Sequence, residues 1–122
     1  MEKKIILAID DNIQQLKIFE MILTPKYDVR VVKSASTAMS FLNNNTVDII
    51  LLDLDMPNIS GVEFLKDIRK IPSYIKVPII IVSGTAKKDF LDKYKNSSAF
   101  EILSKPVVPE MLIETIEKAL AS

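Results

Sequence analysis

The segment Val47-Asp-Ile-Ile-Leu-Leu-Asp53 carries the strongest secondary-structure signal in this 122-residue chain. From Ile49 to Leu52 the residues are β-branched or aliphatic, with no polar residue between them. Such an unbroken apolar run is typical of a strand that helices cover on both faces, as in a parallel sheet. Residues 47–52 are therefore predicted to form a buried strand, and an acidic residue follows it directly.

Further apolar runs lie on both sides of this segment, separated by stretches with helical periodicity. The runs occur at 5–9, 29–32, 79–82 and 100–103. The helical stretches occur at 13–23, 36–43, 61–70, 86–96 and 108–121. This alternation predicts an α/β fold of one domain over 1–122, because right-handed crossovers place the helices on both faces of a five-stranded parallel sheet.

The first expected helix has a recognisable amino-terminal signal. Asn12 is suited to cap it, and Gln15 three residues later completes a pattern like a capping box. Its apolar residues follow a spacing of three to four, which predicts that one stripe faces the sheet. The expected inward residues are Ile13, Leu16, Phe19 and Leu23.

The composition excludes several kinds of chemistry. The chain has no Cys and no His, so disulfides, zinc–thiolate sites, thiol nucleophiles and Ser-His-Asp triads are excluded. Lys+Arg and Asp+Glu both number 16, and this balance argues against binding to nucleic acid or an anionic membrane through net charge. Any site must therefore be built from carboxylates, lysines and hydroxyls.

The sequence gives no sign of targeting to a membrane. The amino-terminal apolar run is too short for a signal-peptide core and has no small-residue cleavage site. No segment approaches the roughly 20 apolar residues of a membrane span. A cytoplasmic location with no membrane partner is therefore expected.

The residues that follow four of the predicted strands are mostly polar or charged. They are Asp10 and Asp11, then Asp53, then Ser83 and Gly84, and finally Lys105 and Pro106. Each has a structural explanation when taken alone, such as a helix cap or a turn. In an open parallel sheet, however, ligands bind outside the carboxyl ends of the strands, so these residues are expected to gather at one edge. The joint pattern favours a functional site.

The residue types at this edge suit phosphoryl chemistry. Three carboxylates held close together repel one another, and a divalent hard cation such as Mg²⁺ relieves that repulsion. A cation, an ammonium and a hydroxyl can together bind a phosphoryl group. A carboxylate nucleophile beside them is the arrangement that forms an aspartyl phosphate, and it needs no general base.

These residues resemble the receiver domain of bacterial two-component response regulators, the CheY-like family. The likeness runs from Ile5 to Leu120. Its marks are Asp10-Asp11, the D-x-x-M-P-x-x-x-G run from Asp53 to Gly61, Ser83-Gly84 and Lys105-Pro106. The resemblance implies a doubly wound, flavodoxin-like sheet with strand order 2-1-3-4-5 and five helices.

The resemblance also implies roles at the metal and phosphoryl positions. Asp53 would be the phosphoacceptor and a metal ligand. Mg²⁺ would be held by Asp11 directly, by Asp10 largely through water, and by the main-chain carbonyl of Asp55. Lys105 would pair with Asp53 and then with the phosphoryl group.

Two further features follow from the same resemblance. Ser83 would donate a hydrogen bond to a phosphoryl oxygen, and the Lys105–Pro106 peptide bond would be cis. The phosphoryl group would come from a sensor histidine kinase or a phosphotransfer protein. The output would be binding of a downstream protein target at the face formed by 86–96, 100–103 and 108–121, with no direct DNA binding. The chain would not be an enzyme that turns over a substrate, and its only chemistry would be its own phosphorylation and autodephosphorylation.

Three positions depart from the usual receiver pattern. Ile102 stands where an aromatic residue is common, and Gly84 replaces the commoner Ala. Asp55 adds a carboxylate at the mouth of the site, where it could repel small acidic phosphodonors or alter attack by water. The sign of that effect does not follow from the sequence.

Alternatives to an active receiver remain at this point. Asp53-Leu-Asp55 also fits the D-x-D motif of haloacid-dehalogenase phosphatases, although that motif ends the first strand in those enzymes and here follows the third. A receiver used only as a docking scaffold is a further possibility, and the departure of Ile102 from the usual aromatic residue is compatible with it. The Met1 start favours a stand-alone regulator over a piece of a longer protein.

Overall fold

The computed structural model of the chain describes residues 3–56, 61–84 and 99–122. Its centre is a five-stranded parallel sheet in the order β2-β1-β3-β4-β5, as predicted. The strands are β1 (Ile5–Ile9), β2 (Asp28–Val32), β3 (Ile49–Asp53), β4 (Ile79–Ser83) and β5 (Glu101–Ser104). Because all strands run the same way, their carboxyl ends lie at one edge of the sheet.

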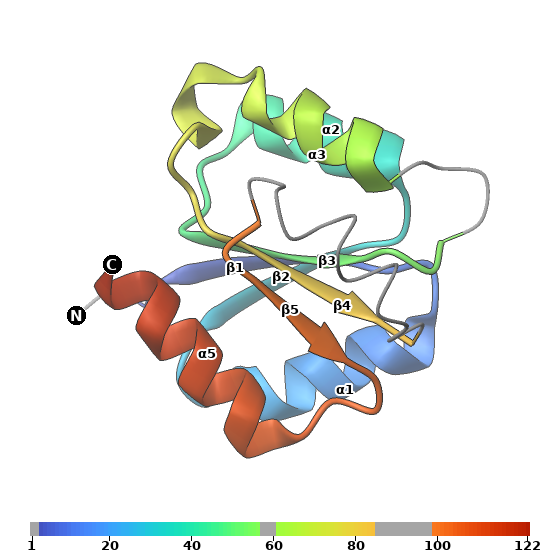
Figure 1. The fold of residues 1–122 in the computed structure, drawn as a ribbon, viewed down its shortest axis with the longest axis vertical. Helices are drawn as coiled ribbons and strands as arrows, with labels where there is room; N and C mark the ends of the chain where they lie inside the picture. Colours follow the sequence, from blue (N-terminus) through green and yellow to red (C-terminus); the bar gives the residue numbers. More distant parts are fainter. Residues whose placement is uncertain (1–2, 57–60, 85–98) are drawn as a thin grey trace.

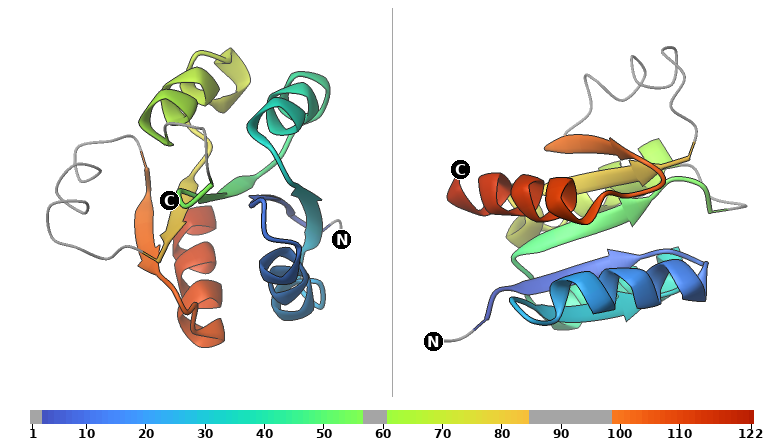
Figure 2. Two further views of the ribbon diagram at one scale, coloured as in Figure 1. Left: turned by 90° about the vertical axis from the view of Figure 1, so that its right-hand side faces the viewer. Right: turned by 90° about the horizontal axis from the view of Figure 1, so that it is seen from below.

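Helices cover both faces of the sheet, so the fold has three layers (Figure 1, Figure 2). The helices α2 (Ala35–Asn44) and α3 (Gly61–Arg69) lie on one face, and α1 (Ile13–Leu23) and α5 (Pro109–Ala121) lie on the other. The helix expected over 86–96 lies outside the described residues. No helix in the described part of the chain is both long enough and apolar enough to cross a membrane.

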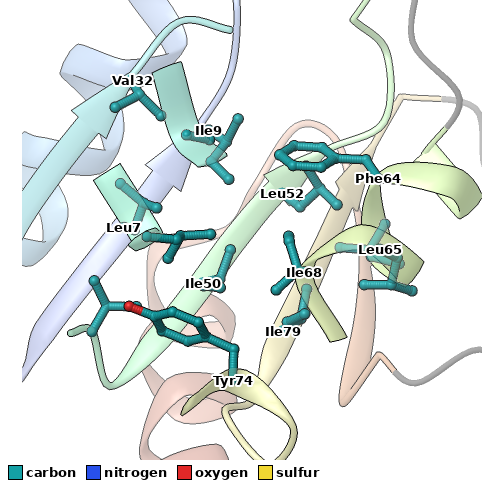
Figure 3. Packing of buried hydrophobic residues seen from close by; sticks show 14 of the residues in the cluster. Leu7, Ile9, Val32, Ile50, Leu52, Phe64, Leu65, Ile68, Tyr74 and Ile79 are labelled. Carbon is teal, nitrogen blue, oxygen red and sulfur yellow. The ribbon is translucent and has the colours of Figure 1, made fainter. Parts of the chain in front are cut away.

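Alternate residues of the strands form two separate apolar cores. On the face toward α2 and α3, Leu7, Ile50 and Leu52 belong to one cluster with Phe64, Leu65 and Ile68 of α3 (Figure 3). On the face toward α1 and α5, Ile6, Ala8, Ile49 and Leu51 pack with Leu16, Phe19, Leu112 and Ile116. Burying each large apolar side chain contributes roughly 1.5–3 kcal/mol. This two-sided burial is the reason that β1, β3 and β4 are nearly continuous apolar runs.

The start of α1 agrees only in part with its prediction. Asn12 caps the helix, because its Oδ1 accepts a hydrogen bond from the Gln15 main-chain N–H at 3.1 Å. The Asn12 N–H donates to Asp10 Oδ1 at 2.9 Å, so Asp10 takes the part that a capping box would give to Gln15. The prediction that Ile13 faces the core is wrong, since its side chain is half-exposed. The first turn of α1 lies beyond the carboxyl end of β1, where the sheet no longer covers it.

The connection from α3 to β4 contains a short 3₁₀ helix, η1 (Pro72–Tyr74), that the sequence did not predict. The Tyr74 side chain is buried, and its hydroxyl donates to the Asn45 carbonyl beyond α2. One nitrogen of the Arg69 guanidinium donates to the main-chain carbonyls of Tyr74 and Val77, each at 2.6 Å. These contacts tie the loop before β4 to α2 and α3.

The central strand offers a direct test of this packing. Replacing Ile50, which is fully buried, with Val should lower the free energy of unfolding by about 0.5–1.5 kcal/mol, because one buried methyl group is lost. Ile75 is largely exposed, so Ile75→Val should change the free energy of unfolding by less than about 0.5 kcal/mol. Urea unfolding followed by circular dichroism measures both. Equal effects at the two positions would contradict the assignment of β3 to the core.

Candidate functional site

The carboxyl ends of four strands position the candidate residues. Asp10 directly follows β1, Asp53 is the last residue of β3, and Ser83 is the last residue of β4. Lys105 directly follows β5, whose last residue, Ser104, pairs with Ser83. The parallel register therefore brings together the residues that the sequence placed at one sheet edge.

Three carboxylates form a compact cluster at this edge. Asp10, Asp11 and Asp53 each offer an oxygen, and these oxygens lie within 4.8 Å of one another. Asp10 and Asp53 are buried, whereas Asp11 is exposed. The predicted proximity of these carboxylates is thus confirmed, and the cluster has one open side toward solvent.

Asp10 is the most constrained acid of the cluster. Its Oδ2 is buried and accepts no hydrogen bond within the described residues. Burial, together with the adjacent Asp53 to which a protonated Asp10 can donate, raises the pKa of Asp10 to about 7. The buried oxygen therefore needs either a proton or a cation.

Lys105 supplies the positive charge that the carboxylates face. Its Nζ donates to Asp53 Oδ1 at 2.9 Å, and it lies 3.4 Å from Asp55 Oδ2 and 3.9 Å from Asp10 Oδ2. Burial alone lowers the pKa of Lys105, but the hydrogen bond to Asp53 and the surrounding carboxylates outweigh it, and the net pKa is raised. Lys105 is therefore charged and directed at the predicted phosphoacceptor.

The donor set fits a hard divalent cation. Carboxylate oxygens with an open solvent side are the ligands that Mg²⁺ prefers, and Asp10 Oδ2, which accepts no hydrogen bond within the described residues, is suited to bind such an ion. Asp10, Asp11 and Asp53 are the residues that could hold it. The part predicted for the main-chain carbonyl of Asp55 stays a prediction.

The Asp55 side chain makes contacts that the sequence did not reveal. Its Oδ1 accepts a hydrogen bond from Ser83 Oγ at 3.2 Å, and its Oδ2 accepts one from the Gly84 main-chain N–H at 2.7 Å. Sequence reasoning placed this carboxylate at the mouth of the site without a partner. The available signal was that Asp55 and Gly84 both depart from the usual pattern, but nothing in the sequence linked them.

The remaining predicted features are in place. The Lys105–Pro106 peptide bond is cis, as expected. The main-chain N–H of Asp55 donates to Asp53 Oδ1 at 3.0 Å, so the Asp53 carboxylate is oriented by both its own loop and Lys105. The side chain of Ile102 is partly buried and packs at the margin of the core toward α2 and α3. A single site therefore joins the polar residues that the sequence placed at this edge, which are Asp10, Asp11, Asp53, Asp55, Ser83 and Lys105.

The chain belongs to the response regulator receiver domain family, whose family model matches residues 6–117. It is thus a receiver domain of the two-component type, which is a signalling domain, and members of this family typically bind Mg²⁺. This match supports the receiver interpretation over the haloacid-dehalogenase phosphatase.

Individual relatives place this domain in proteins of different lengths. The hydrogenase transcriptional regulatory protein HoxA of Cupriavidus necator is 31% identical over 116 residues, which are 94% of this chain but 24% of HoxA. The polar-differentiation response regulator DivK of Brucella ovis is 26% identical over 118 residues, which are 96% of each chain. The chain therefore spans about a quarter of the first relative and nearly all of the second.

Solved structures agree with this assignment. The chemotaxis protein CheY4 of Vibrio cholerae superposes with a TM-score of 0.90 at 27% identity, over 97% of this chain and 99% of CheY4. A putative response regulator of Chloroflexus aurantiacus superposes with a TM-score of 0.91 at 24% identity, over 99% and 100% of the two chains. The second likeness supports the fold alone.

The buried Asp10 oxygen that accepts no hydrogen bond within the described residues leads to a prediction for the metal-free protein. Asp10→Asn should raise the free energy of unfolding by on the order of 2 kcal/mol at about pH 8 in chelator, because a buried negative charge is removed. The amide oxygen can still accept the hydrogen bond from the Asn12 N–H. Urea unfolding of both proteins measures the difference, with Asp67→Asn as an exposed control.

The stability that Asp10→Asn gains over the wild type should depend on pH. In the wild type, the pKa of Asp10 is raised from 3.8 to about 7 on folding, so protonation stabilises the folded state below 3.8 and this stabilisation is lost as the pH rises through about 7. The advantage of Asp10→Asn should therefore grow between these values and stay constant above them. An equal advantage at about pH 4 and about pH 8 would contradict this account of Asp10.

Proposed function

We propose that this receiver domain is a phosphorylation-dependent signalling switch that accepts a phosphoryl group on Asp53. The observation that carries the proposal is the 2.9 Å contact between Lys105 Nζ and Asp53 Oδ1, inside a cluster of three carboxylates suited to Mg²⁺. The Asp53 carboxylate is held by Lys105 and by the Asp55 N–H, and both donors bind the same oxygen, Oδ1. Oδ2 accepts neither of these two hydrogen bonds and is our choice for the nucleophile.

The proposed step is direct transfer from a phosphohistidine on a partner protein. A carboxylate oxygen of Asp53 forms a P–O bond as the P–N bond breaks. The donor ring is protonated on its other nitrogen, so the departing nitrogen keeps the bonding electron pair and the ring leaves as neutral imidazole with that same proton. Positioning and charge stabilisation are the main requirements of such transfers. The absence of His in this chain is consistent with a donor on another protein.

Each residue of the cluster has one part in this scheme. Mg²⁺ held by Asp10, Asp11, Asp53 and the Asp55 main-chain carbonyl would offset the charge that builds up on the phosphoryl oxygens. Lys105 pairs with Asp53 before transfer and with the phosphoryl group afterwards. Ser83 donates its hydroxyl to a phosphoryl oxygen. The only chemistry proposed for the chain itself is this phosphorylation and its autodephosphorylation.

The proposed partners follow from the same chemistry. A sensor histidine kinase or a phosphotransfer protein supplies the phosphoryl group, and a downstream protein target binds the face built by residues 86–96, β5 and α5. We propose that residues 1–122 act as one receiver domain in the cytoplasm, without direct contact to DNA or membrane. Because Ile102 has no ring to rotate, the output is proposed to depend on main-chain movement near Ser83.

The proposal is tested by labelling with acetyl phosphate and Mg²⁺, followed by intact-protein mass spectrometry. The wild type should gain one phosphoryl group, and Asp53→Asn should gain none, because the acceptor oxygen is replaced by an amide. Asp11→Ala and addition of chelator should each prevent labelling of an otherwise intact Asp53. Asp67→Asn, an exposed acid with the same change of charge, should label normally.

Two results would contradict this proposal. Undiminished labelling of Asp53→Asn would mean that another residue is the acceptor. Failure of the folded wild type to bind Mg²⁺ or to label would favour a receiver that acts only as a docking scaffold.

A further inference from the structure

We propose that the Asp55 carboxylate occupies the phosphoryl-binding position of the resting protein and must leave it before a phosphoryl group can be accommodated. This inference rests on the proposed function, since it concerns the position next to Asp53. It assigns to Asp55 a role as an internal competitor, which we call the carboxylate latch. The latch makes Asp55 a residue that sets how readily the site accepts an anion.

Three hydrogen-bond donors surround the Asp55 carboxylate. Asp55 Oδ1 accepts from Ser83 Oγ at 3.2 Å, and Asp55 Oδ2 accepts from the Gly84 N–H at 2.7 Å and lies 3.4 Å from Lys105 Nζ. A hydroxyl, a main-chain amide and an ammonium that converge on one anion are the groups that bind a phosphoryl oxygen. Ser83 and Lys105 are also the donors that the proposed function assigns to the phosphoryl group.

Gly84 leaves the space that the Asp55 carboxylate occupies. A Cβ atom added at Gly84 would lie 3.1 Å from Asp55 Oδ2 and 3.9 Å from Lys105 Cδ. The first distance is tighter than ordinary van der Waals contact, and the second is ordinary. An alanine at this position would therefore crowd the carboxylate and leave the lysine undisturbed. The two departures from the usual receiver pattern thus form one structural unit, in which Gly84 makes room for Asp55.

The latch can open without rearranging the fold. The main chain of Asp55 is held beside the acceptor, because its N–H donates to Asp53 Oδ1 at 3.0 Å. Its side chain is 35% exposed, so rotation about the side-chain bonds can carry the carboxylate into solvent. The Asp55 side chain can therefore adopt both the resting position and the open position without movement of the main chain.

Competition follows from charge and from shared donors. A phosphoryl group on Asp53 is negatively charged, and a carboxylate left on Ser83, Gly84 and Lys105 would repel it and withhold the donors that it needs. The apparent affinity of the site for such an anion is reduced by the fraction of molecules in which the latch is open. Removing the carboxylate should therefore tighten the binding of a phosphoryl analogue.

The test is the affinity of the full chain for beryllofluoride at saturating Mg²⁺, measured from amide chemical shifts. Asp55→Ala should bind about tenfold more tightly than the wild type, equivalent to about 1.4 kcal/mol. Asp55→Asn keeps the size of the side chain and removes its charge, and should also bind more tightly. Asp67→Asn should match the wild type, which controls for net charge.

A double-substitution comparison tests the link to Gly84. Gly84→Ala alone should tighten beryllofluoride binding, because the added methyl group weakens the hold on Asp55. In the Asp55→Ala background the same substitution should have almost no effect, since the nearest remaining atom is at an ordinary contact distance. Equal effects of Gly84→Ala in both backgrounds would overturn the structural link between the two residues.

The outcomes separate this inference from the proposed function. If the wild type binds beryllofluoride with Mg²⁺ but Asp55→Ala and Asp55→Asn bind equally or more weakly, the latch is wrong and the phosphoacceptor site stands. If neither the wild type nor any variant binds although all are folded by circular dichroism, the proposed function falls and the latch falls with it.

Discussion

Parallel pairing of β3 with β1 and β4 is the constraint on which the site depends. It places Asp53 at the end of a buried strand and next to Asp10, which follows the neighbouring strand. The two carboxylates are driven together by hydrophobic burial of the residues before them, although their charges repel. Lys105 directly follows β5, and its contact with Asp53 offsets this repulsion. The apolar core thus holds an acidic cluster that would not gather by itself.

This arrangement explains why the resting site is ready for ligands of both signs. The cluster has an excess of negative charge, and Asp10 Oδ2 accepts no hydrogen bond within the described residues, so the cluster suits a cation. Beside it, the donors Ser83, Gly84 and Lys105 suit an anion, and in the resting protein they contact Asp55. Cation and phosphoryl group are therefore expected to support each other's binding, because each neutralises charge that the other brings.

The sequence predicted those features that follow from local pattern. The strands could be located because burial on both faces requires continuous apolar runs, and the strand ends then identified Asp10, Asp53, Ser83 and Lys105. Contacts between distant segments could not be predicted in the same way. The hydrogen bonds of the Asp55 carboxylate depend on the distance between the loops after β3 and β4. The exposure of Ile13 depends on where the sheet ends. Both are properties of the assembled fold.

The most direct test of the central claim is a crystal structure of the protein with Mg²⁺ and beryllofluoride. The account predicts beryllium bonded to a carboxylate oxygen of Asp53, Mg²⁺ on the oxygens of Asp10 and Asp11, and fluorine atoms within hydrogen-bond distance of Ser83 and Lys105. It also predicts the Asp55 carboxylate turned toward solvent. Beryllofluoride bound away from Asp53, or Mg²⁺ bound away from the carboxylate cluster, would contradict it.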